Sequence, residues 1–489
     1  MLLWVLFCSG CVHIPEKVHD VQTTSFSAEV SWTPSSIVSS LQVPKKMLPI
    51  PAEQIRKEHA RLSLVDVVDI ALQNNPAIHS AWYDARAAAA KYFSSRGAWF
   101  PTINLNSSLT YSKGSTMPGL PIGQTQGPIT TTLITADLNY LLFDFGGRSA
   151  AIKEAHQALF AANWTQNSAI QDTLLQVETA FFNHVGATAQ LEANGVSLAD
   201  AEANLAAAEE KRRVGMATGA DVLQAKTAYE EAVLAVQNAR GTLRKAKGAL
   251  AIAMGYPANT IFNLETQIPN IPHAALTQSV DELINRAIST RPDVQASRAN
   301  FLEARARITE TRSRMLPTLS ASGNVSRIWS GRTFGVSTPY NISLSLQVPV
   351  FNGFSYQFDI LQAKAGADSA LENSRSAEQA ASYQVLSSHS DFLTANENVT
   401  TTRVLMDSAL QSEKVALGRY KEGVGSFLDL LSAQKALASA RSQQISAHVN
   451  WFISLAQLAH DIGILGIHGE NPLIPGRTSS DVSEVKSHD

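Results

Sequence analysis

Four segments of the chain alternate apolar and polar residues with a period of two, which is the pattern of a β-strand with two different faces. They lie at 102–111, 134–142, 318–326 and 340–350, and the last is the most regular. Strands of about ten residues, apolar on one face and uncharged but polar on the other, are typical of outer-membrane β-barrels. A soluble β-sandwich would have more strands, and shorter ones. The pattern therefore favours the wall of a barrel.

Much longer segments between and after the strands have a helical pattern. The expected helices are 147–213, 221–254, 355–421 and 427–463. The first and third would each be on the order of 100 Å long, at about 1.5 Å per residue. Leu191, Leu198 and Leu205 recur at every seventh position with alanine between them, which is the spacing of a coiled-coil seam. The glycines expected to turn each long helix into its returning helix are Gly215, Gly219, Gly423 and Gly425.

The order of these elements occurs twice along the chain. An Asn-Pro break at Pro76 is matched by an Arg-Pro break at Pro292, and Pro101 and Pro317 follow them at the same spacing, each just before a strand. A repeat this long is not the unit of a solenoid. Each half is therefore expected to contain short helices, a β-hairpin, a long helix, a tip and a returning helix.

The duplication divides the chain and sets its fold class, which is mainly α with a share of a β-barrel. The expected divisions are a signal segment with a lipidation motif at 1–11, an extended tether at 12–61, repeat 1 at 62–255, a linker at 256–279, repeat 2 at 280–464 and a disordered tail at 465–489. The two hairpins are expected at about 101–143 and 317–351.

Four strands cannot close a barrel, which needs at least about eight. The chain is thus expected to share a barrel with copies of itself. Two copies would make a barrel of about eight strands with little open lumen, whereas three would make one of about twelve. A homotrimer is the better inference.

The composition excludes several classes of function. The formal net charge is −3 and 17% of residues are charged, so no polybasic nucleic-acid surface is expected. The twelve histidines are scattered, with no HExxH spacing, and neither a P-loop nor a GxSxG motif occurs. We therefore expect no enzymatic activity, no metal site and no cofactor.

The N-terminus has the features of an export signal. Residues 1–7 are apolar but too few to span a bilayer, and they lead into Cys8-Ser9-Gly10-Cys11, where small residues precede a cysteine as in a lipoprotein cleavage site. Lipidation of Cys11 is the prediction, and a plain secretory signal with an incidental cysteine is the alternative. No other apolar run reaches the roughly 18 residues of a membrane-spanning helix.

Over residues 62–463 the chain resembles the TolC family of outer-membrane efflux proteins. The resemblance rests on the two copies of helix, hairpin, long helix and tip, on the proline breaks, and on the Phe-Asp-Phe-Gly and Phe-Asn-Gly-Phe turns that begin at Phe143 and Phe351. It implies a trimer with a 12-stranded outer-membrane β-barrel and a 12-helix periplasmic tunnel. It also implies a periplasmic adaptor protein and an inner-membrane pump of the RND or ABC type as partners. Cys11 resembles the lipoprotein branch of the family.

The resemblance places a gate at the periplasmic tips. Asp221 matches a gate aspartate and Tyr420 a gate tyrosine, while Asp429 is the counterpart of Asp221 in the second half. In a trimer each aspartate would form a ring of carboxylates that favours cations; the alternative is that these residues only cap helices. The chain departs from the family pattern at Gly425 and Ser432, so the gate is expected either to be latched more weakly or to be held by other cations. The candidates are Arg212, Arg213 and Arg419.

The predicted function is passive conduction from a pump to the exterior, in efflux or in type I secretion. A periplasm-spanning coiled-coil protein that does not conduct is the alternative, although it would not explain two matched hairpins. The resemblance leaves the substrate open among drugs, metals and proteins, because it implies that selectivity resides largely in the pump. No stretch rich in Met or His favours metals.

Overall fold

The computed structural model describes residues 24–25, 27–32, 61–113, 128–265, 271, 278–330 and 336–465. The predicted lipidation site at Cys11, most of the tether and nearly all of the predicted tail lie outside the described residues. The chain forms two compact units. A helical unit takes Met1–Ala85, Ala162–Ala296 and Ser376–Asp489, and a sheet unit takes Arg86–Ala161 and Ser297–Arg375.

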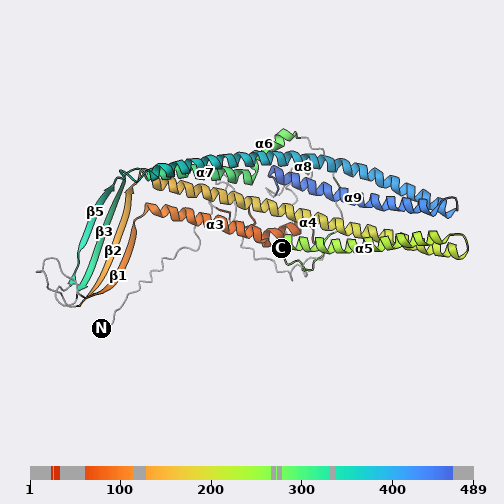
Figure 1. Ribbon diagram of the computed structural model, residues 1–489, viewed down its shortest axis with the longest axis horizontal. Helices are drawn as coiled ribbons and strands as arrows, with labels where there is room; N and C mark the ends of the chain where they lie inside the picture. The colour runs from red at the N-terminus through yellow and green to blue at the C-terminus, as the bar shows by residue number, and fades with distance from the viewer. Residues whose placement is uncertain are drawn as a thin grey trace, which may run out of the picture. The chain divides into compact units, whose positions relative to one another are not determined.

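The sheet unit contains one antiparallel sheet, in which β1, β2, β3 and β5 lie side by side (Figure 1). Its strands are β1 (Thr102–Ser112), β2 (Ile129–Phe143), β3 (Thr318–Ser330), β4 (Val336–Ser337) and β5 (Tyr340–Gln347). The last strand ends at Gln347 and not at the expected residue 350, because Pro349 has no N–H for the ladder. β3 extends four residues beyond its apolar alternation, to Ser330, because it stays paired with β2.

The strand register keeps the two faces of the sheet distinct. On the polar face, the hydroxyls of Thr135 and Ser326 lie 3.0 Å apart and those of Ser322 and Ser343 lie 2.7 Å apart. On the apolar face the side chains are exposed, and Ile342 is 82% exposed. A sheet with an exposed apolar face requires a lipid or protein partner.

Two pairs of long antiparallel helices follow the hairpins. The helices are α2 (Leu64–Asn74), α3 (Pro76–Arg96) with the short 3₁₀ helix η1 (Gly97–Trp99), α4 (Gly147–Arg213), α5 (Gly219–Ala253), α6 (Val280–Thr290), α7 (Pro292–Ser313), α8 (Ser355–Lys421) and α9 (Phe427–Ile462). α5 runs back along α4, and Asn194 of α4 donates to the carbonyl of Ala235 at 3.2 Å. Ala409 of α8 packs against Leu437 of α9 in the same way. Among the described residues, no helix has both the length and the apolar content to cross a membrane.

Each proline break carries a side chain that reaches the end of a returning helix. Asn75 and Arg291 precede the two prolines and have extended backbones, with ψ of 121° and 127°, because a following proline disfavours the helical region. Asn75 Nδ2 donates to the carbonyl of Ala253, at the end of α5, at 3.0 Å. Arg291 Nη1 donates to the carbonyl of Asp461, at the end of α9, at 3.2 Å. The two halves thus use different side chains for one contact.

The returning helices end against those breaks through glycine. Gly255 and Gly463 follow α5 and α9 with φ of +83° and +81°, and each closes a Schellman turn. A Cβ at Gly255 would lie against the backbone of Asn74, 2.7 Å from its carbonyl carbon. A Cβ at Gly463 would lie 3.0 Å from the backbone nitrogen of Arg291. Only glycine meets both the backbone angle and the close approach at these positions.

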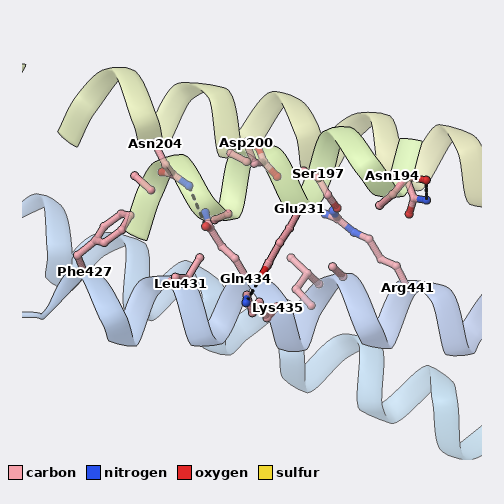
Figure 2. Close-up of a pocket in the computed structure, with 17 residues that line it drawn as sticks. Asn194, Ser197, Asp200, Asn204, Glu231, Phe427, Leu431, Gln434, Lys435 and Arg441 are labelled. Carbon is pink, nitrogen blue, oxygen red and sulfur yellow. Dashed lines mark hydrogen bonds and ion pairs between the residues drawn. The ribbon is translucent and has the colours of Figure 1, made fainter. Parts of the chain in front are cut away.

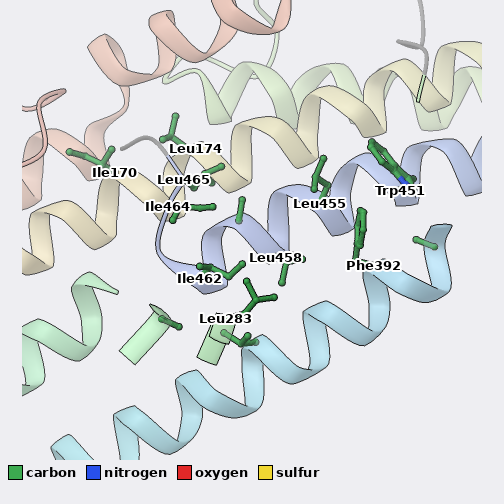
Figure 3. Packing of buried hydrophobic residues seen from close by; sticks show 14 of the residues in the cluster. Ile170, Leu174, Leu283, Phe392, Trp451, Leu455, Leu458, Ile462, Ile464 and Leu465 are labelled. Carbon is green, nitrogen blue, oxygen red and sulfur yellow. The ribbon is translucent and has the colours of Figure 1, made fainter. Parts of the chain in front are cut away.

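The core of the helical unit is built around the last third of α9 (Figure 3). Trp451 and Leu458 are 2% and 0% exposed, and they pack with side chains from α4, α6 and α8. The largest of these partners are Ile170, Leu174, Leu283, Val385 and Phe392. Residues far apart in sequence therefore meet here, and this cluster joins the two halves of the chain.

A short part of the predicted tether is bound to α4. The backbone N–H of Trp32 donates to Asn167 Oδ1 at 2.6 Å, and Asn167 Nδ2 returns a bond to the Trp32 carbonyl at 2.7 Å. Gln166 Nε2 donates to Ser25 Oγ at 2.5 Å, and the Trp32 ring stands edge-on to Trp164. This segment is held by side-chain amides of α4 and not by a helix or strand of its own. Its sequence therefore has no periodicity from which the contact could be predicted.

Candidate gate at the helical tips

Of the four glycines predicted at the tips, two have a left-handed backbone and two do not. Gly215 and Gly423 have φ of +78° and +75° and end α4 and α8 in Schellman turns. Gly219 instead begins α5. Gly425 donates its N–H to the carbonyl of Arg419 at 3.0 Å, close to the backbone of α8. The two tips are thus built on the same turn, with equivalent glycines at its centre.

Asp221 and Asp429 both complete capping boxes at the start of a returning helix. Asp221 Oδ2 accepts from the N–H and the hydroxyl of Thr218, each at 2.8 Å. These bonds, the backbone one first, lower the pKa of the Asp221 carboxyl below its usual range. Asp429 Oδ2 accepts from the Ser426 N–H at 3.3 Å. Within the described part of the chain, capping uses only one oxygen of each carboxylate, which leaves Oδ1 for another partner.

Tyr420 connects the two helical hairpins at the tips. Lys211 of α4 places its ammonium 3.7 Å from the centre of the Tyr420 ring, within the range of a cation–π interaction. The ring also packs against Phe427 of α9, with centroids 5.6 Å apart. Phe427 is 7% exposed and contacts Ala208 and Ala225 of the first hairpin. The aromatic pair therefore fills the gap between the hairpins.

Two polar contacts bridge the same hairpins further from the tips (Figure 2). Asn204 Nδ2 donates to Gln434 Oε1 at 2.8 Å, and Lys435 Nζ lies 2.9 Å from Glu231 Oε2. They cross a groove of about 200 Å³ that α4, α5 and α9 line. The ion pair is more than half exposed and contributes little to stability. Its effect is to align the hairpins.

A second titratable cluster lies where α9 ends. Burial alone would lower the pKa of His460, but hydrogen bonds to Asp172 at 2.8 Å and to Asp461 at 3.0 Å outweigh it and raise the pKa to about 9. Arg291 Nη1 lies 4.0 Å from Asp461. Burial alone would raise the pKa of the Asp461 carboxyl, but its hydrogen bond to His460 outweighs this effect and keeps the pKa below the usual range. Among the described residues, no group of His, Cys, Asp or Glu is arranged to hold a metal ion.

The structure brings the predicted gate residues to one region without joining them to one another. Asp221 and Asp429 contact their own caps, and Tyr420 contacts Lys211. Of the cations expected at the latch, Arg213 pairs with Glu210 of its own helix. Lys211 was missed by the sequence reasoning. No spacing in the sequence could have found it, because its contact with Tyr420 depends on how α4 and α8 are aligned.

Both halves of the chain are similar to known outer-membrane proteins. The profile of the outer membrane efflux protein family matches residues 67–256 and 283–463, one segment in each half. Protein CyaE of Bordetella pertussis is 26% identical over 84% of this chain and 86% of its own length. Outer membrane protein OprJ of Pseudomonas aeruginosa is 25% identical over 76% and 77%.

The fold agrees with the sequence comparison. The structure of the CmeC outer membrane channel of Campylobacter jejuni superposes with a TM-score of 0.76 at 19% identity, over 87% of this chain and 90% of that one. The predicted fold class, two repeats of helices around a β-hairpin, is confirmed by this likeness. The chain belongs to the outer membrane efflux protein family.

Proposed function

We propose that this outer-membrane efflux channel works as a homotrimer, with a 12-stranded barrel continued by a 12-helix tunnel. The observation that carries the proposal is the open sheet. Each chain has one sheet whose apolar face is exposed, as at Tyr340 (79%) and Leu105 (75%), and whose edge strands β1 and β5 each have a single partner among the described strands. Unpaired edges are not tolerated in a membrane, so neighbouring copies must supply the missing partners.

The trimer would conduct passively. The chain supplies a path, and a periplasmic adaptor and an inner-membrane pump of the RND or ABC type supply the energy. The groove between α4, α5 and α9 is the surface we assign to the adaptor, because small side chains such as Ala201 and Ala228 line it and allow another helix to approach closely. The same observations favour conduction over a purely structural coiled coil, which would have no use for an apolar sheet face.

The gate would be formed by Asp221, Asp429 and Tyr420 at the narrow end. Capping occupies Oδ2 of each aspartate, so Oδ1 is available to a neighbouring subunit. Rings of three carboxylates would favour cations over anions. Lys211 holds Tyr420 between the hairpins, which keeps the tip closed until an adaptor separates them.

Single-trimer conductance in planar bilayers tests the channel and the gate together. The wild-type trimer should insert and conduct weakly, whereas Asp221→Ala combined with Tyr420→Ala, which removes the ring that Lys211 contacts, should raise the conductance severalfold. Thr218→Ala is the matched control, because it weakens the same cap by about 1 kcal/mol and leaves the carboxylate in place. A wild-type protein that never conducts would refute the channel. Unchanged conductance in the double variant, or an equal rise in the control, would refute the gate.

We also propose that the mature chain begins at a lipidated Cys11. Mass spectrometry of the N-terminal peptide from outer membranes would detect the added acyl chains, and a peptide that starts elsewhere without them would count against it.

A further inference from the structure

Arg327 places a positive charge on the apolar face of the sheet. Its neighbour Ser326 faces the other way, where its hydroxyl meets Thr135 at 3.0 Å. Arg327 therefore shares the face of Trp329, and its guanidinium carbon lies 5.3 Å from the centre of that ring. The backbone of Arg327 is paired with Ile134 of β2, which is on the apolar face too. The guanidinium thus lies over an aromatic ring on the side of the sheet that meets lipid.

The position of Arg327 along the strand puts it near one edge of the membrane. The helix-joined end of the apolar face is marked by Leu319, which pairs with Phe143, and by the contact of Phe143 with Phe145 at 4.7 Å. Arg327 is eight residues further along β3, or about 27 Å at 3.4 Å per residue, and a strand tilt of about 40° reduces this to roughly 20 Å of height. The apolar band of such barrels is about 25 Å tall. Arg327 therefore reaches the edge of the band away from the helices.

Among the described residues, no acidic side chain lies against this charge. Among the described strand residues, Arg327 is the one charged residue on the apolar face, and no described carboxylate lies within ion-pair distance of it. The nearest acid in the sheet is Asp137, which faces the polar side and accepts from Asn106 Nδ2 at 2.7 Å. An arginine at the bilayer midplane would be strongly unfavourable, whereas one at the interface is tolerated and can meet an anionic group.

We propose that Arg327, stacked on Trp329, binds the phosphate of a phosphorylated glycolipid in the outer leaflet. A guanidinium donates two parallel hydrogen bonds to two oxygens of a phosphate. Stacking on the indole ring holds the plane of the guanidinium at the depth of the lipid headgroups. Trp329 itself is suited to that level, because its ring has an apolar body and a polar N–H. Three copies of the chain would give three such sites around the barrel. The proposal rests on the proposed outer-membrane trimer and adds a lipid ligand to it.

Native mass spectrometry of the full-length trimer in detergent tests the site. Bisphosphorylated lipid A and its dephosphorylated form are titrated against the wild type, Arg327→Gln, Arg327→Lys and Arg375→Gln. The last variant is the control, because it removes the same charge from an exposed position on α8, where Arg375 pairs with Glu372. We expect Arg327→Gln to bind the phosphorylated lipid about fivefold more weakly, with a smaller loss in Arg327→Lys. The dephosphorylated lipid should show no difference between variants.

Three results would overturn the site, two of them from the titrations and one from competition. One is equal binding of both lipids by the wild type, which needs no variant to fold. The second is full binding by Arg327→Gln. Competition by millimolar inorganic phosphate should be weak, because the acyl chains contribute to the binding of the lipid, and full displacement by phosphate would exclude a lipid site. Conductance of the variants separates this proposal from the channel itself, since Arg327→Gln should conduct as the wild type does.

Discussion

Alanine at Gly255 should destabilise the protein far more than alanine at Gly215. Both glycines have a left-handed backbone, with φ of +83° and +78°, so alanine at either costs about 1–2 kcal/mol for that conformation. Gly215 has open space where a Cβ would go, whereas at Gly255 the Cβ would lie against the backbone of Asn74. Forcing that backbone aside costs about 1–3 kcal/mol more, as in an overpacked core. The expected losses are about 1–2 kcal/mol at Gly215 and about 2–5 kcal/mol at Gly255.

The pair Gly423 and Gly463 repeats the comparison in the second half of the chain. Gly423 is open, and Gly463 is pressed against Arg291. Urea unfolding of the four variants in detergent, followed by circular dichroism, gives the ranking directly. The expected order places Gly255→Ala and Gly463→Ala below Gly215→Ala and Gly423→Ala in stability. Equal losses at all four positions would refute the reasoning, because the backbone angle alone would then explain them.

Two further predictions concern other contacts in the helical unit. His460 has a pKa of about 9 in the folded protein and about 6.5 in the unfolded chain. The stability that it contributes beside Asp172 and Asp461 is therefore fully present below pH 6.5 and is lost as the pH rises through 9. The unfolding midpoints of the wild type and His460→Gln should converge between pH 6.5 and 9.5. Asn167→Leu removes both bonds to the backbone of Trp32 and should cost about 2 kcal/mol or more, with faster hydrogen exchange at the Trp32 amide and unchanged exchange in α9.

The long elements could be predicted from the sequence because each carries its own periodicity. Leucines at every seventh position predict a seam whatever the partner, and the alternation in β5 predicts a strand from its own residues. The capping role of Asp221 is also local, since Thr218 stands three residues before it. Such features depend on neighbours in sequence, and pattern reasoning finds them.

The contacts between the hairpins could not be predicted in this way. The pairing of Lys211 with Tyr420 depends on how α4 and α8 are aligned, and no spacing within either helix encodes that alignment. The bonds from Asn167 to Trp32 were missed for a related reason: one buried amide replaces a strand partner, and it leaves no periodic trace. Sequence reasoning thus found the elements and missed the side chains that join them.

The contacts at the ends of the two helical hairpins limit how many residues can be inserted into their helices. α5 is held at both ends, by the turn at Gly215 and by the contact of Gly255 with the break at Asn75. A single inserted residue would rotate everything beyond it by about 100° and misalign the seam. Only steps of about seven residues, made in both helices of a hairpin, preserve the phase of both ends. Because Asn204 is bonded to Gln434, the other hairpin must lengthen by the same step. The length of the two helical hairpins is therefore restricted to such steps, and the four long helices can only change together.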